Sequence, residues 1–226
     1  MRPGSLRPFL TFQLLLMKLY YVEVAPNPTK VRLYIAEKIA GGAAISLDEI
    51  RVKLIKGEQN EAAHLQRTRF ATVPVLEIGP DDYIIESRAI MDYLEDLFPD
   101  PCMLGQNPRE RAQAREVERI TELRVLTPIG RYVHATNSPI GLPKSADIAA
   151  DASKTLITGL NYVESLLNDG RQFLVGEMPT MADCTLAAAL QFARFGNVEV
   201  DPRYSCLARW ERAYCQREFC KSVLSL

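Results

Sequence analysis

Val73-Pro74 and Glu86-Ser87 are the residues of this 226-residue chain whose types and spacing most suggest chemistry. Pro74 precedes an apolar run, and a proline, which has no N–H, is tolerated at the start of a strand. A cis Val73–Pro74 bond would leave the backbone N–H and C=O of Val73 unpaired and able to bind an extended peptide. Glu86-Ser87 opens a helical pattern, and the N–H groups at a helix start attract a carboxylate. Together the two motifs predict a site for a small anionic peptide.

The segments that must position these motifs alternate between strand and helix patterns. Strand-like runs cover 18–22, 49–54, 74–78 and 83–85, and helical patterns cover 29–40, 61–67 and 87–97. Gly79-Pro80-Asp81-Asp82 is typical of a hairpin turn. Two βα units followed by a hairpin predict a small mixed sheet of four strands with helices on its faces.

The chain after residue 98 shows only helical patterns. The stretch 99–107 predicts a linker, and helices are predicted over 109–134, 146–167, 180–195 and 203–214, with a short tail helix. Pro128 is expected to kink or break the first of these helices, because it removes one backbone hydrogen bond. Thr180 and Asp183 have the spacing of a capping box, so we interpret Asp183 as a folding element rather than a catalytic acid.

In this order and spacing the motifs resemble those of the glutathione transferases. The likeness begins at Met17 and includes the strand 18–22, the Pro26-Asn27-Pro28 turn, the stretch 56–59, the two motifs above and the stretch 173–183. It implies an α/β N-terminal thioredoxin-like domain plus an all-α C-terminal helical domain. The implied divisions are an N-terminal extension at 1–16, a glutathione-binding domain at 17–98, a linker at 99–107 and a substrate-binding domain at 108–226.

The resemblance implies a contact for each part of the tripeptide glutathione. Glu86 would pair with the γ-glutamyl ammonium, and Ser87 would hold the γ-glutamyl carboxylate. Val73, with Pro74 setting its geometry, would align the cysteinyl backbone, and Gln59 would contact the glycyl carboxylate. The simpler alternatives are a helix-capping Glu86, a solvated Gln59 and an ordinary trans Pro74.

Thr72 is a further candidate for a contact with glutathione. Many members of the resembled family carry Lys, Gln or Arg just before the Val-Pro pair. This chain has Thr72 there, so it lacks the cationic contact that such a residue would make with glutathione. Arg69 could supply the missing charge, although a surface arginine is an equal alternative.

The group that would stabilise the glutathione thiolate is left open by the sequence. The resemblance places the usual serine at Ala25, which has no donor. Asn27 is the next donor in that loop, and its amide can donate to sulfur and favour the ionised thiol. Asn27 as only a helix N-cap, with Pro28 first in the helix, is an equal alternative. Tyr20 or Tyr21 could take the same role, but a buried strand tyrosine is the more common outcome.

The second substrate would lie against the helical half, again by resemblance. Tyr132 and Val125 could face that cleft, and Arg124 and Arg131 lie on the same predicted helix. His134 could act as a base because an unperturbed histidine titrates near neutrality, although a lone helix histidine is more often a surface or packing residue. No residue identifies the electrophile.

Composition narrows the classes of function. A net charge of −1 with dispersed basic residues disfavours nucleic-acid binding. The five cysteines form no CxxC pair, and with only two histidines they predict no metal site and a reducing cytoplasm. Arg2 and Arg7 precede an apolar run that faintly resembles a signal peptide, but no small-residue cleavage site follows and the run is too short to span a membrane. We therefore interpret residues 1–16 as an extension.

The resulting expectation is a cytoplasmic, homodimeric glutathione transferase. It would activate glutathione, its co-substrate, as a thiolate and conjugate it to a hydrophobic electrophile. A glutathione-dependent disulfide reductase or peroxidase on the same fold is one alternative, which the resemblance associates with Asn27 in the turn. A non-catalytic glutathione-binding protein is the other, and Ala25 favours it.

Overall fold

A computed structural model describes residues 17–224, and the expectations for 1–16 lie outside these residues. Four strands form one mixed sheet, as predicted: β1 (Met17–Tyr21), β2 (Leu47–Arg51), β3 (Val75–Gly79) and β4 (Asp82–Ile85). The strand order is β2-β1-β3-β4; β1 pairs parallel with β2 and antiparallel with β3, and β3 and β4 form the predicted hairpin.

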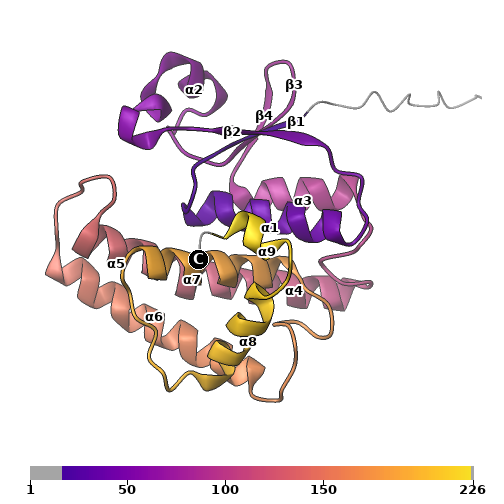
Figure 1. Ribbon diagram of the computed structural model, residues 1–226, viewed down its shortest axis with the longest axis vertical. Coiled ribbons are helices and arrows are strands. Elements are labelled where there is room, and N and C mark those ends of the chain that lie inside the picture. The colour runs from indigo at the N-terminus through magenta and orange to yellow at the C-terminus, as the bar shows by residue number, and fades with distance from the viewer. Residues whose placement is uncertain (1–16, 225–226) are drawn as a thin grey trace, which may run out of the picture.

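Two helices lie together on one side of the sheet, α1 (Pro26–Ala40) and α3 (Ser87–Leu97), as Figure 1 shows. Their apolar residues join the main core. The opposite face of the sheet carries a separate small cluster of Tyr20, Val52 and Val75, against which Leu54 packs. Leu54 belongs to the 3-10 helix η1 (Leu54–Lys56), which precedes η2 (Glu58–Asn60) and the short helix α2 (Ala62–Arg67).

The described chain after α3 is helical. Its elements are α4 (Pro108–Thr121), the π-helical turn η3 (Glu122–Leu126), α5 (Thr127–Asn137), α6 (Ala146–Leu167), α7 (Met181–Phe195), α8 (Ser205–Cys215) and α9 (Cys220–Val223). Within the described part of the chain, no helix is both long enough and apolar enough to cross a membrane.

Pro128 does not end the helix in which it lies, although the regular α-helix is interrupted there, as expected, by a π-helical turn. Proline has no N–H, so the Arg124 carbonyl one α-helical turn earlier loses its partner. The π-helical turn η3, which is wider than an α-turn, lies at this point and lets α4 continue into α5. Gly159 of α6 packs directly against the turn, because a Cβ at Gly159 would stand 2.2 Å from the Arg124 carbonyl oxygen.

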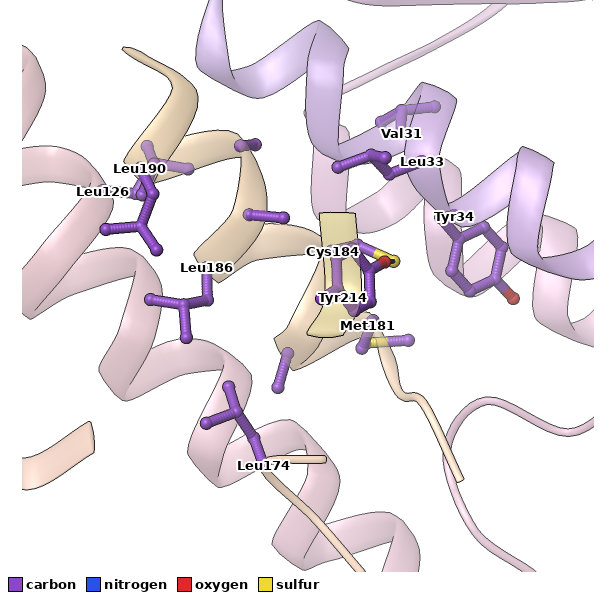
Figure 2. Packing of buried hydrophobic residues seen from close by; sticks show 14 of the residues in the cluster. Val31, Leu33, Tyr34, Leu126, Leu174, Met181, Cys184, Leu186, Leu190 and Tyr214 are labelled. Carbon is purple, nitrogen blue, oxygen red and sulfur yellow. Dashed lines mark hydrogen bonds between the residues drawn. The ribbon is translucent and has the colours of Figure 1, made fainter. Parts of the chain in front are cut away.

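Helix α7 forms the centre of the core and joins the two halves of the molecule. All its residues from Met181 to Ala193 are buried. In Figure 2, Leu190 lies beside Leu126 of the helical half, whereas Cys184 lies toward α1 and its Tyr34. The predicted capping box starts α7, with the Thr180 N–H donating to Asp183 Oδ2 at 2.8 Å. The core is therefore continuous across both halves, and it fixes α1 relative to the helices below the sheet.

Candidate functional site

Asn27 and Ser87 meet at the point where α1 and α3 begin. Ser87 is the first residue of α3 and Asn27 the second of α1, and the two are 60 residues apart in the chain. The Ser87 hydroxyl donates to Asn27 Oδ1 at 3.4 Å. Because O–H···O bonds are usually 2.5–3.0 Å long, this contact is weak and could be exchanged for one with a ligand.

The start of α1 corrects one of the alternatives for Asn27. The helix begins at Pro26 rather than Thr29, and its N-cap is Ala25, which makes no side-chain cap bond. Asn27 is therefore not the N-cap. Of the three residues that open the helix only Asn27 has an N–H, since Pro26 and Pro28 have none. The side-chain Nδ2 of Asn27 has no hydrogen-bond partner among residues 17–224. Asn27 thus offers a main-chain and a side-chain donor at the positive end of a helix dipole.

Glu86 precedes α3 in an unusual backbone conformation. Its φ is +69°, in the left-handed region that few residues other than glycine adopt. Its carbonyl accepts the first helical bond, from the Ile90 N–H at 3.0 Å, but its side chain makes no cap bond and is exposed. The helix-capping alternative for the Glu86 carboxylate was therefore wrong.

Val73 and Pro74 lie just before the sheet. The peptide bond between them is cis, and Pro74 is buried. Pairing in the sheet begins at Val75, which lies opposite Tyr20 and Ile85. The described residues supply no hydrogen-bond partner to the N–H or C=O of Val73. These two backbone groups are the free pair that the sequence predicted.

Thr72 and Gln59 lie on the α2 side of this loop. The Thr72 hydroxyl is 3.4 Å from that of Thr68, and the Thr72 carbonyl lies 3.0 Å from His64 Nε2. Gln59 is half-buried, and its Oε1 is shielded from solvent without a partner in the described chain. The side chain of Gln59 is therefore only partly exposed to solvent, and its contact with the glycyl carboxylate stays a prediction. Arg69 is exposed, and its role remains a prediction.

Both strand tyrosines are packing residues, the outcome considered more common. The Tyr20 hydroxyl donates to Glu77 Oε2 at 2.7 Å, and burial, followed by this bond, raises the pKa of Tyr20. The ring of Tyr21 belongs to the main core, with the Arg32 guanidinium 4.4 Å from its centroid. The Tyr20 hydroxyl is therefore already committed to a carboxylate.

The residues expected on the first long helix of the helical half separate into different environments. Val125 is 0 % exposed in the core, so the expectation that it faces a cleft was wrong. Arg131 pairs with Asp151 at 2.8 Å. His134 Nδ1 lies 3.0 Å from the Ser138 hydroxyl, and burial lowers the pKa of its imidazole. Tyr132 is half-buried and Arg124 is exposed.

A surface hollow of about 750 Å³ opens at the connection between α7 and α8, and it is not part of this site. Its lining includes Leu190, Arg194, Glu199 and Glu211, and none of the predicted site residues. Concavity alone therefore does not identify the candidate site, which is defined by free donors at two helix starts and one loop.

Sequence reasoning missed two residues that hold the site. Arg88, the neighbour of Ser87, pairs with Glu118 of α4, and Glu118 also accepts from the Thr185 hydroxyl at 3.1 Å. His64 holds the Thr72 carbonyl, as described above. No local pattern indicates either contact, because each depends on how separate elements pack.

Comparison with known proteins gives two family matches in this chain. Residues 19–102 match the model described as "Glutathione S-transferase, N-terminal domain", and residues 146–213 match the one described as "Glutathione S-transferase, C-terminal domain". The chain is similar to Glutathione S-transferase 2 of Saccharomyces cerevisiae, with 28% identity across 93% of this chain and 90% of the yeast protein.

Two further comparisons extend this likeness. A maleylacetoacetate isomerase of Emericella nidulans is 30% identical across 70% of this chain and 71% of its own length. The crystal structure of Gtt2 from Saccharomyces cerevisiae superposes with a TM-score of 0.82 at 28% identity, covering 92% of this chain and 100% of that one. The chain therefore belongs to the glutathione S-transferase family, with a thioredoxin-like N-terminal domain followed by a helical C-terminal domain.

Proposed function

We propose that this protein binds glutathione at the start of α1 and α3 and uses its thiolate to attack a hydrophobic electrophile. One observation carries the proposal: the starts of α1 and α3 meet, with the Ser87 hydroxyl 3.4 Å from Asn27 Oδ1, so the donors of two helix N-termini face one region. Membership in the glutathione S-transferase family supports glutathione as the co-substrate, and no metal is required for this reaction.

The γ-glutamyl end of glutathione would bind at the start of α3. Ser87 is buried at the first helical position, where its N–H and hydroxyl are both available to a carboxylate. Its single hydroxyl proton now points to Asn27, so the ligand carboxylate would replace that weak bond. The exposed Glu86 carboxylate, which makes no cap bond to its helix, would pair with the ligand ammonium.

The remainder of the tripeptide would extend along the loop before β3. The free N–H and C=O of Val73, just before Pro74, form the two-bond pattern with which one strand recognises another. Gln59 has a buried acceptor without a partner and would reach the glycyl end through its amide. Thr72 would add a hydroxyl contact at the edge of the site.

The thiol would lie at the start of α1. Asn27 would donate from its backbone N–H and its side-chain amide to the sulfur, and the helix dipole would add to their effect. Each contact favours the thiolate and so lowers the thiol pKa. The thiolate then forms a C–S bond with the electrophile, and the displaced electron pair leaves with a leaving group or takes up a proton.

Two other reactions remain candidates because specific observations favour them. The similarity to a maleylacetoacetate isomerase favours glutathione-dependent isomerisation of a cis-alkene acid. Asn27, in the turn that carries the usual serine in many relatives, favours disulfide or peroxide reduction. One assay panel separates these from transfer: a chlorinated aromatic electrophile, a maleyl-type acid, and hydroxyethyl disulfide with cumene hydroperoxide.

The decisive experiment measures ionisation of bound glutathione by the ultraviolet absorbance of its thiolate. Wild-type protein should hold glutathione as a thiolate near neutral pH, and Asn27→Ala should shift that ionisation to higher pH. Turnover should fall roughly 10²-fold, as for loss of one preorganised donor, with a much smaller change in affinity for glutathione. Asn137→Ala, at the exposed end of α5, is the matched control. Unchanged turnover in Asn27→Ala would exclude Asn27 from the mechanism. A wild type that binds glutathione but turns over none of these substrates would instead favour a non-catalytic binding protein.

We also propose a cytoplasmic homodimer. Phe70, on the loop before Val73, is 67 % exposed, and large exposed aromatic side chains are typical of interfaces. All five cysteines are free thiols in the structure, which suits a reducing compartment. Sedimentation of wild type and Phe70→Ser tests the dimer, and a monomeric wild type would contradict it.

A further inference from the structure

His64 makes a buried contact with the loop that carries the free backbone groups of Val73. It lies in α2, is 2 % exposed, and places Nε2 3.0 Å from the Thr72 carbonyl oxygen. A carbonyl oxygen can only accept, so Nε2 carries the hydrogen in this contact. The other ring nitrogen, Nδ1, is buried without a partner among residues 17–224. The ring therefore makes one directed hydrogen bond, and that bond goes to the Thr72–Val73 peptide.

The orientation of this peptide determines where the Val73 N–H points. The Thr72–Val73 bond is trans, since the described chain has cis bonds only at Val73–Pro74 and Asp100–Pro101. In a planar trans peptide the C=O and the N–H point in opposite directions. A Thr72 carbonyl held toward His64 therefore aims the Val73 N–H away from α2.

We propose that His64 is a positioning residue that aims the Val73 N–H at the cysteinyl carbonyl of glutathione. The inference rests on the proposed function, because it assumes that Val73 aligns the tripeptide. It assigns His64 no role in the chemistry of the sulfur, which lies at the start of α1.

The rest of the loop gives this peptide little other support. The Thr68 hydroxyl is 3.4 Å from both the Thr72 hydroxyl and the Phe70 N–H, so both contacts are long. Ala71 has a φ of +54°, an unfavourable region for a residue with a Cβ. In the described chain, His64 is the residue whose side chain holds the Thr72 carbonyl, so its loss would free the peptide plane to rotate.

The test compares two ligands on three variants by calorimetry. The ligands are glutathione and an analogue in which the carbonyl between cysteine and glycine is replaced by a methylene. His64→Phe keeps a ring but removes the donor, and His64→Gln keeps an N–H at similar reach. Gln66→Ala, on the exposed side of the same helix, is the control.

Loss of the donor should weaken glutathione binding roughly ten-fold, the equivalent of one hydrogen bond. His64→Gln should recover most of this affinity, and the analogue should bind wild type and His64→Phe equally. Equal losses for both ligands would indicate a merely structural role and overturn the proposal. Unchanged glutathione affinity in His64→Phe would overturn it too, while leaving the proposed function intact. A wild-type protein that does not bind glutathione would instead overturn both.

A second measurement on wild type needs no folded variant. Nitrogen-edited NMR should show a hydrogen on His64 Nε2 with and without glutathione, and glutathione should shift the Val73 amide signal. A hydrogen on Nδ1 alone, or a Val73 amide unaffected by saturating glutathione, would overturn the inference even if His64→Phe does not fold.

Discussion

Helix α1 carries two fully buried lysines, and their surroundings differ. Lys38, near the end of the helix, donates to the carbonyls of Phe98 and Pro101, each at 2.7 Å, and pairs with Glu95 at 2.6 Å. Lys30, one turn after Asn27, lies 3.3 Å and 3.6 Å from two carboxylates, and its Nζ makes no contact that meets hydrogen-bond geometry in the described residues.

The difference shows that the two ends of α1 have different physical roles. At the linker end the buried ammonium donates to two carbonyls and pairs with a carboxylate, so the chain from Phe98 to Pro101 is held against the helix. At the site end, charge is balanced by Glu118 and Glu122, but donors remain without acceptors. A buried polar group without a hydrogen-bond partner is costly, and Lys30 is such a group one turn from Asn27, where the ligand is proposed to bind.

Lys38→Met should have the largest effect of the variants that test this comparison. Removing Lys38 leaves the buried Glu95 charge without a cation, although Tyr34 and the Met103 N–H still donate to it, and should cost about 3–5 kcal/mol of unfolding free energy. Urea denaturation measures the loss, with Lys144→Met, at an exposed lysine, as control. A loss no greater than that of the control would mean that the linker end is not held by Lys38.

Lys30→Met should cost less, about 1–3 kcal/mol, because its contacts are long and both carboxylates keep other partners. Glu118 retains Arg88 and Thr185, and Glu122 retains Arg119 at 3.0 Å. Urea denaturation of both variants shows which lysine contributes more to the free energy of unfolding. A larger loss than that of Lys38→Met would reverse the comparison.

Ser87→Ala tests the site end directly. Loss of its hydroxyl should weaken glutathione affinity by about 1–3 kcal/mol, the cost of an unmet contact to a charged group. Calorimetry measures the affinity, and Ser165→Ala, at an exposed position of α6, should bind as wild type does. An unchanged Kd in Ser87→Ala would remove the γ-glutamyl carboxylate from the start of α3.

Glu37→Gln should have the smallest effect on the free energy of unfolding, and this effect should change with pH. Burial raises the pKa of Glu37, against the opposing effect of its partner Arg217 at 2.8 Å. The folded protein therefore holds this proton more tightly than the unfolded chain, so acidification toward the ordinary value stabilises the fold. At pH 7 the variant should lie within about 1 kcal/mol of wild type, because Arg217, the partner left behind, is 32% exposed and can be solvated by water. Wild type should gain stability relative to the variant toward pH 4.5. Parallel pH profiles of unfolding would contradict this sign.

The sequence predicted the bounds of a helix correctly where the apolar periodicity and the helix-start residues indicated the same limits. Helices were expected over 87–97 and 146–167, and the structure has α3 and α6 with these bounds. The start of α1 was misplaced by three residues, because Ala25 offers no capping side chain and two prolines obscure the helical pattern. The form of the irregularity near Pro128 was not predicted, because the π-helical turn packs against Gly159 of α6, a contact between distant segments.

In the candidate site, too, some residues could be predicted from the sequence and others could not. Val73 and Ser87 could be selected from motif spacing, since they lie at a strand entry and a helix start, and Asn27 could be selected from the family resemblance. The sequence could not predict that Val125 is buried in the core or that His64 contacts the Thr72 carbonyl. Burial and hydrogen bonding depend on neighbours from other elements.

By itself the sequence determined the order of strands and helices, the family and the residues that carry donors, because periodicity, proline and caps act over a few neighbouring positions. Only the tertiary structure decided which atoms meet. Ser87 reaches Asn27, His64 reaches the Thr72 carbonyl and Lys38 reaches Pro101 because α1, α2 and α3 pack around one small sheet. A hydrogen bond is sensitive to a few tenths of an ångström, and distances between such distant segments are fixed by the whole core rather than by local pattern.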